Sequence, residues 1–160
     1  MQKQKIQFEI SYLKPQDLSV ADTELLASAH EALNTSYSPY SNFKVGAALR
    51  LASGTIVQGS NQENASFPAG LCAERVAVFQ AGVRFPGEVI ETIAIAVSGG
   101  SLPATPAAPC GNCRQAILEY ELRQDRPIRY LLAAGNETVV AIPSTRDLLP
   151  LGFDSSYLKQ

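Results

Sequence analysis

The chain has 160 residues, of which 46% are hydrophobic and 18% charged, with a net charge of −2. This length fits one domain, over 1–160, and so much apolar sequence with so little charge excludes a disordered chain. No apolar run approaches the roughly 18 residues that cross a bilayer, and nucleic-acid binding usually requires an excess of basic residues. We therefore expect a soluble, cytoplasmic protein whose partner is neither a membrane nor a nucleic acid.

The first half of the chain predicts three strands and one helix. The expected elements are, in order, an edge strand or extended arm over 6–12 that ends near Pro15, a helix over 21–34, and two strands over 43–49 and 55–59 joined by a turn at 53–54. The strands are indicated by alternation of apolar and polar residues, and the helix by apolar positions at helical spacing. Asp22 or Thr23 is available as the helix cap.

The second half predicts strands that alternate with helices. The expected elements are a loop over 61–70, a helix over 72–81 that stops at Gly82, a strand over 92–97, an irregular proline-rich connection over 99–109, a helix over 111–124, strands over 128–134 and 138–142 around Gly135-Asn136, and a short helix over 144–149. This order favours an α/β sandwich whose sheet of about five strands mixes a hairpin with crossovers. Parallel pairs should arise where helices 72–81 and 111–124 connect strands.

Three cysteines stand at the predicted starts of two helices. Cys110 and Cys113 are three residues apart, so both sulfurs fall on one side of a first helical turn, and Cys72 begins the other helix. Helix N-termini lower thiol pKa values, so three thiolates could converge on one cation. A catalytic zinc ion with three protein ligands leaves the fourth position to water. Glu74, two residues after Cys72, is placed to handle the protons of that water.

The charge of such a site points to a cationic neighbour. Three thiolates around Zn²⁺ sum to −1, which should weaken the metal as a Lewis acid. Arg75 and Arg114, each next to a site residue, could correct this by donating hydrogen bonds to the sulfurs. We favour Arg75.

The same cysteines permit other interpretations. Cys110 and Cys113, taken alone, are typical of a redox dithiol. His30, the single histidine of the chain, could complete a structural zinc site as a fourth ligand, although it also fits an ordinary helix position. Single buried cysteines also occur as core residues, but this leaves the two cysteine motifs as a coincidence.

Two motifs resemble the signature of the cytidine deaminases, in the branch with three cysteine ligands. They are Cys72-Ala73-Glu74-Arg75 and Pro109-Cys110-Gly111-Asn112-Cys113-Arg114-Gln115. Segments 37–48, 61–66 and 148–150, and then Phe153, are similar to the same family in the same order, so the resemblance covers about 21–153. It implies a cytidine-deaminase-like α/β/α sandwich, with residues 1–15 as an N-terminal extension outside the match.

The resemblance also implies a reaction. Cytidine and 2′-deoxycytidine would be hydrolysed to the uridines with release of ammonia, as in pyrimidine salvage. One zinc ion per chain would be held by Cys72, Cys110 and Cys113, and Glu74 would carry protons from the water to the pyrimidine N3 and to the departing amine. Deaminases of tRNA or DNA generally carry His-x-Glu, which is missing here, and deaminases of blasticidin lack the Asn61-x-Glu63-Asn64 motif.

The remaining implied site residues would bind substrate. Phe43 would pack on the base, and Asn61 and Glu63 would bind the ribose 3′-hydroxyl, which needs both a donor and an acceptor. The other implied substrate-binding residues are Val45, Ala73 and Phe153. In the three-cysteine branch Phe153 would reach the pocket of an adjoining subunit in a homotetramer. The chain departs from the family at Phe67, where a tyrosine is common.

Overall fold

The computed structural model describes residues 1–98, 106–133 and 138–158. In this part of the chain, one sheet of six strands has the order β1-β6-β5-β4-β2-β3. The strands are β1 (Ser11–Leu13), β2 (Lys44–Leu51), β3 (Ile56–Ser60), β4 (Ile90–Ser98), β5 (Arg129–Ala133) and β6 (Val139–Ile142). The sheet thus has the expected strands plus β1, which is the short end of the predicted arm. Residues 99–105 of the predicted irregular connection over 99–109, and the turn at Gly135-Asn136, lie outside the described residues.

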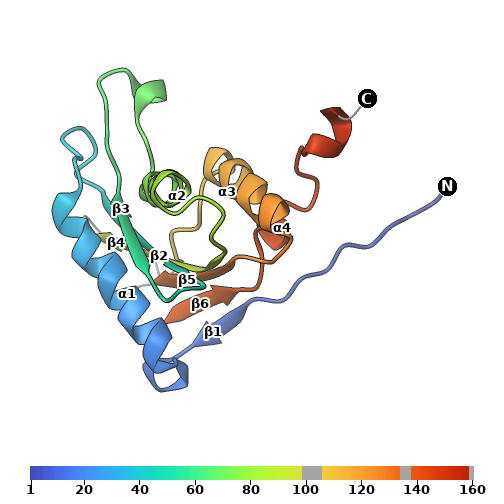
Figure 1. Ribbon diagram of the computed structural model, residues 1–160, viewed down its shortest axis with the longest axis horizontal. Coiled ribbons are helices and arrows are strands. Elements are labelled where there is room, and N and C mark those ends of the chain that lie inside the picture. Colours follow the sequence, from blue (N-terminus) through green and yellow to red (C-terminus); the bar gives the residue numbers. More distant parts are fainter. Residues whose placement is uncertain (99–105, 134–137, 159–160) are drawn as a thin grey trace.

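Helices cover both faces of this sheet. They are α1 (Val20–Ala32), α2 (Ala73–Arg84), α3 (Gly111–Gln124) and α4 (Thr145–Leu148). Figure 1 shows α1 on one face and the other three on the opposite face. Each face has its own buried cluster: α1 packs on Ala48, Ala94 and Leu131, while α2 and α3 pack on the side of Leu49 and Ile95. The expected α/β/α sandwich is confirmed. Within the described residues, no helix is long and apolar enough to cross a membrane.

The pairing of the strands differs in one respect from expectation. A parallel pair forms across α3, between β4 and β5, as predicted. Across α2 the prediction was wrong, because β2 lies between β3 and β4 and is antiparallel to both. Therefore β3 and β4 run in the same direction and end at the same edge of the sheet. The helices that follow them, α2 and α3, consequently start at that edge.

The cap of α1 also corrects the prediction. Ser19 caps this helix, with its Oγ accepting from the N–H of Asp22 at 3.1 Å. The carboxylate of Asp22 instead accepts from Arg129 on β5 at 2.9 Å. A partly buried ion pair between distant segments thus uses the side chain that local sequence offered as a cap.

Two glycines fix how closely α2 packs. The helix does not stop at Gly82 but continues to Arg84, and Gly82 lies against α3: a Cβ there would come 2.5 Å from the Tyr120 hydroxyl, so that side chain would have to shift. On β3, a Cβ at Gly59 would collide with the backbone of Ala73 and Ala77. Gly59 is therefore required for α2 to lie directly on β3, and Gly82 lets Tyr120 of α3 pack closely beside it.

A buried carboxylate joins α3 to α4. Glu121 is 3% exposed and accepts hydrogen bonds from the N–H groups of Ile128 and Thr145, both at 2.8 Å, and from Ser144 Oγ at 2.7 Å. The N–H of Arg146 adds a fourth donor at 3.2 Å. Each carboxylate oxygen serves two donors, and an ionised carboxylate can accept all of them.

We expect Glu121→Gln to destabilise the fold. The amide can turn its NH₂ group toward Ser144 Oγ, which can accept, and its neutral oxygen then accepts from the N–H groups of Ile128 and Thr145. Hydrogen bonds to a charged group contribute about 1.5–3 kcal/mol and those to a neutral group about 0.5–1.5 kcal/mol, so the free energy of unfolding should fall by about 1–2 kcal/mol. Urea denaturation measures this, with the exposed Glu119→Gln as the matched control. Equal midpoints for the two variants would contradict this role of Glu121.

Candidate active site

The three cysteines of the sequence motifs meet in the structure. Cys72 is the N-cap of α2, Cys110 is the N-cap of α3, and Cys113 lies in the first turn of α3. Their sulfur atoms all lie within 4.8 Å of one another, with 3.4 Å between Cys110 and Cys113 and 4.0 Å between Cys72 and Cys110. The shared starting edge of α2 and α3 therefore produces a cluster from residues 38 positions apart.

The three thiols perturb one another. The hydrogen bond with the Cys113 thiol is the largest of the effects that lower the pKa of Cys72 to about 6. The same interaction, with burial, raises the pKa of Cys113. Thiols packed this closely cannot all ionise unless a cation compensates their charge, and thiolates are the form that binds zinc.

The groups around the cluster suit a zinc ion. The donor set of three thiols matches the soft ligands that zinc prefers. Arg75 donates from Nη2 to the carbonyl of Gly70 at 3.2 Å, while its Nε is buried without a partner among the described residues. Arg114 is committed elsewhere, donating to the carbonyls of Pro109 at 2.7 Å and Leu148 at 3.0 Å. Of the two arginines, Arg75 thus retains a donor that a thiolate could use.

The alternative interpretations of the cysteines fare less well. His30 is exposed on α1, on the other side of the sheet, and is not part of the ligand cluster found in the described residues. The sulfur of Cys72 lies 4.0 Å from that of Cys110, close enough for both to bind one metal ion. A redox dithiol of Cys110 and Cys113 would not require a third cysteine at this place. The cluster is therefore the geometry of a metal site rather than of a two-cysteine redox pair.

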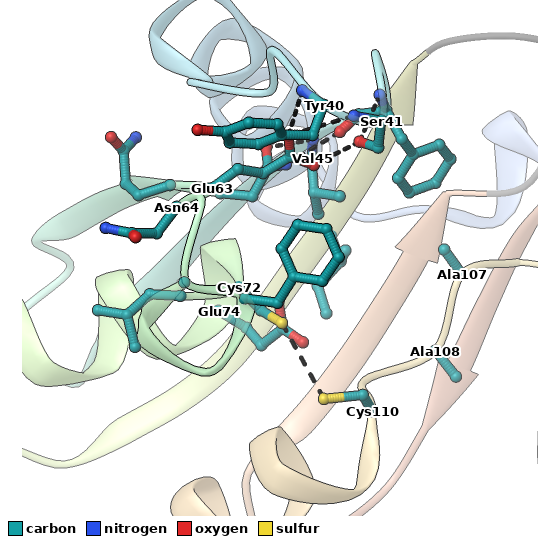
Figure 2. A pocket seen from close by; sticks show the side chains of 17 residues that line it. Tyr40, Ser41, Val45, Glu63, Asn64, Cys72, Glu74, Ala107, Ala108 and Cys110 are labelled. Atoms are coloured by element: carbon teal, nitrogen blue, oxygen red, sulfur yellow. Dashed lines mark hydrogen bonds between the residues drawn. The ribbon is translucent and has the colours of Figure 1, made fainter.

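Glu74 lies beside this cluster. It is 4% exposed, stands in the first turn of α2 and lines the pocket next to Cys72. Figure 2 shows Glu74 next to Cys72, with Cys110 facing them from the other helix. Its carboxylate is close enough to contribute to the raised pKa of Cys113. A carboxylate so placed can exchange protons with a molecule bound over the sulfur atoms.

The cluster lies at one end of a pocket of about 580 Å³. This volume is in the range of small-molecule sites. Its walls are mainly apolar side chains, with a few convergent polar groups; among the lining residues are Phe43, Val45, Phe67, Leu71, Ile95 and Ala107. Four predicted substrate-binding residues, Phe43, Val45, Asn61 and Glu63, line it.

Asn61 and Glu63 also hold the loop before β2. Asn61 Oδ1 accepts from the N–H of Val45 at 2.8 Å and from Ser36 Oγ at 2.5 Å, while its Nδ2 donates to the Phe43 carbonyl at 2.9 Å. Glu63 accepts a hydrogen bond from Ser41 Oγ and one from the N–H of Tyr40 at 2.9 Å. These bonds, with Ser41 the larger effect, lower the pKa of Glu63.

Two predicted substrate-binding residues do not line this pocket in the described structure. Ala73 is fully buried between Cys72 and Glu74, at the first position of α2. Phe153 is 56% exposed beyond α4, where its ring stacks on Tyr157 at 5.4 Å. Its backbone carbonyl accepts from Gln115 of α3 at 2.8 Å. Its ring is therefore available on the surface.

Sequence reasoning did not assign roles to Tyr40 and Ser41. Ser41 Oγ bridges two predicted site residues, since it donates to Glu63 and accepts from the N–H of Phe43 at 3.0 Å. Tyr40 places its ring edge-on to Phe67, with centroids 6.2 Å apart. The signal available in the sequence was only their place in a turn before a strand, which does not reveal a partner 22 residues away.

Comparisons with known proteins agree on one family. The model of the cytidine and deoxycytidylate deaminase zinc-binding region matches residues 19–125. A cytidine deaminase of Halalkalibacterium halodurans is 42% identical over 95 residues, which are 59% of this chain and 68% of that protein. A cytidine deaminase of Mycobacterium tuberculosis is 37% identical over 108 residues, 66% of this chain and 77% of that protein.

A solved structure supports the same assignment. The crystal structure of cytidine deaminase from Burkholderia pseudomallei matches with a TM-score of 0.70 and 38% identity, over 82% of this chain and 98% of that one. The family match contains all three clustered cysteines and Glu74. This chain therefore belongs to the family of zinc-dependent cytidine and deoxycytidylate deaminases.

Proposed function

We propose that this enzyme hydrolyses cytidine and 2′-deoxycytidine to uridine and 2′-deoxyuridine with release of ammonia. The observation that carries the proposal is the placement of Glu74 beside Cys72, Cys110 and Cys113 at the end of a pocket with an aromatic wall. We take the pocket, the cluster and the sheet as one deaminase domain over 1–160, with 1–15 as its extension. Salvage of pyrimidines in the cytoplasm is the role that fits such a reaction, and metal-held thiols suit that reducing compartment.

Glu74 has the role of a proton carrier in this proposal. Zinc held by the three cysteines would make a water acidic enough to yield hydroxide near neutral pH. Glu74 would accept a proton from the water and deliver it to N3 of the pyrimidine. It would then take the proton of the hydroxyl group added at C4 and supply it to the departing amine, which leaves as ammonia. In this proposal the base binds with C4 and N3 toward Glu74, so that one buried carboxylate serves each transfer.

The polar pair Asn61 and Glu63 is proposed to bind the ribose 3′-hydroxyl. Asn61 Oδ1 is already used by two donors, but one hydrogen of Nδ2 remains after its bond to the Phe43 carbonyl. Glu63 retains one lone pair on Oε1 beside those used by Ser41 Oγ and by the N–H groups of Tyr40 and Ser41. One donor and one acceptor therefore remain, which is what a hydroxyl needs.

Phe43, Val45 and Ala73 are proposed to bind the base. Phe43 and Val45 stand at the start of β2 and line the pocket, and an aromatic ring is a suitable stacking surface for a pyrimidine. Ala73 contributes through its backbone, since the first N–H groups of a helix have no partner within the helix. In this proposal the N–H of Ala73 donates to the carbonyl oxygen of the pyrimidine.

Phe153 is proposed to complete the pocket of a neighbouring subunit in a homotetramer. Its ring is exposed and does not line the pocket of its own chain. Together with Tyr157 it forms an apolar surface next to the C-terminal segment. Burial of that surface against another subunit would remove it from water.

Metal analysis tests the ligand assignment. We expect about one zinc ion per purified chain, and Cys113→Ser should lose most of it because one of three protein ligands is replaced. His30→Ala is the control and should retain zinc. A protein that retains zinc without Cys113, or loses it without His30, would require different ligands.

Assays of Glu74→Gln test the proton transfers. The amide can hydrogen-bond but cannot carry a proton, so turnover of cytidine should fall by about 10²–10⁴-fold, the range typical of a general acid–base group. Zinc content and thermal stability should stay near those of the native protein, and the exposed Glu88→Gln should retain full activity.

The same assay defines the substrate class. The native enzyme is offered cytidine, deoxycytidine, cytosine, cytidine monophosphate, adenosine and blasticidin, and ammonia is followed. Activity on both cytosine nucleosides and little on the others is expected. Full activity of Glu74→Gln, or a preference for blasticidin, would overturn the proposal.

Phe153→Ala tests the shared pocket. We expect the native chain to sediment as about four chains, and the substitution to lower both assembly and activity because it removes apolar contact area between subunits. Val20→Ala, which also truncates an exposed apolar side chain, should change neither. A native monomer with full activity would refute the shared site.

A further inference from the structure

Residues 1–10 form an extended arm that leaves the body of the protein at β1. All ten residues are exposed, and they precede residue 19, where the family match begins. No side chain of the arm forms a hydrogen bond or ion pair with another described residue. Figure 1 shows the arm pointing away from the sheet and its helices.

The arm nevertheless has the sequence of a strand with one buried face. Ile6, Phe8, Ile10 and Tyr12 alternate with polar residues, and their exposed fractions are 51%, 49%, 42% and 68%. In an extended chain these four side chains share one face. A row of four large apolar residues in water is unfavourable and marks a surface that a partner covers.

The chain's own sheet cannot extend to cover this arm. In the β1–β6 pair Ser11 faces Ala141, so Glu9 would face Pro143 if the ladder continued. Proline has no N–H to donate, and α4 begins directly after its cap Ser144. Strand β6 therefore ends where the arm would need a partner, while β1 remains an edge strand with a free side.

The charges of the arm are complementary to those of a second arm in the antiparallel direction. Lys3 and Lys5 lie at its start and Glu9 lies near its end. Antiparallel pairing brings the lysine end of one arm beside Glu9 of the other. In-register parallel pairing would instead place each lysine, and each Glu9, beside the same residue of the second arm. Opposite charges across paired strands stabilise the pair, and like charges destabilise it.

We propose that residues 1–13 pair as an antiparallel strand with the same residues of a second copy of this chain, about a two-fold axis through Gln7. In this register Ile6 lies opposite Phe8 of the second copy, and Lys5 lies opposite its Glu9. The first residues of the second copy then run along the free side of β1, so each sheet gains one strand. Taken alone, a two-fold contact of this kind is closed, because each arm is used up by its partner.

Neighbouring registers satisfy fewer of these conditions. An axis through Phe8 keeps apolar residues opposite one another but places Glu9 opposite Gln7. An axis through Glu9 places two glutamates opposite each other. The axis through Gln7 combines apolar pairs on one face with two Lys5–Glu9 pairs on the other.

Disulfide formation in the zinc-loaded protein tests the pairing. In the proposed register residue 7 of one chain lies opposite residue 7 of the other, with Cβ atoms about 4.5–5.5 Å apart. Gln7→Cys should therefore form a covalent dimer under mild oxidation. Gln4→Cys is the matched control, since its two copies lie about 20 Å apart, and should react at least about ten-fold more slowly.

Charge reversal tests the register. In the Gln7→Cys background, Lys5→Glu or Glu9→Lys should slow the formation of the covalent dimer, and the two changes together should restore it. Mixing the two singly reversed chains should also restore it, because each arm then meets its complement. Lys3→Glu makes the same change of charge opposite Ser11 and should have a smaller effect.

Three outcomes would overturn the proposal. One is equal rates of dimer formation for Gln7→Cys and Gln4→Cys, which would mean that the arms meet only by random collision. Another is absence of any covalent dimer, which would place the arm elsewhere. The third is a doubly reversed chain as slow as the singly reversed ones. These readouts concern the arm alone and do not depend on deaminase activity or on a tetramer.

Discussion

The common starting edge of α2 and α3 is the constraint on which the site of this protein depends. It follows from the position of β2, which lies between β3 and β4 and is antiparallel to both, so that β3 and β4 end at the same edge of the sheet. Both helices then present their N-termini, with partly positive N–H groups, to one point. Three thiolates and a carboxylate at that point benefit from both dipoles. Gly59 allows α2 to lie close enough to β3 for this convergence.

Residues that face the pocket also hold its walls together. Asn61 fixes the start of β2 through Val45 and Phe43, and Glu63 holds the preceding turn through Tyr40 and Ser41. A rigid wall reduces the entropy that is lost when a small ligand binds. The bonds within the protein therefore preorganise the groups that we propose for the sugar, rather than competing with it. Ser41 links the aromatic wall to the carboxylate in the same way.

The sequence predicted the elements that depend on local pattern. It also predicted the metal ligands, because each lies in a short motif, although Cys72 and Cys110 are 38 positions apart. Helix α3 has the predicted bounds because Cys110 and Gln124 lie at the ends of one continuous pattern. The errors arose where a distant segment decided the outcome. Asp22 pairs with Arg129 instead of capping α1. Gly82 lies inside α2 and packs against Tyr120 instead of ending the helix. Strand β2 lies between the two strands that α2 connects. None of these partners is near in sequence.

Apolar side chains left uncovered at two places offer two different surfaces to a partner. Phe153 stacks on Tyr157 beyond α4, and the arm before β1 carries its own exposed row. The two surfaces differ in kind, since the first is a folded segment anchored by Gln115 and the second is an extended arm with the apolar alternation of a strand. A folded patch gains from burial alone, but a strand must also satisfy its backbone groups, and another strand does so best. The edge at β1 therefore favours a partner that supplies a strand, whereas the surface at Phe153 requires only a complementary shape.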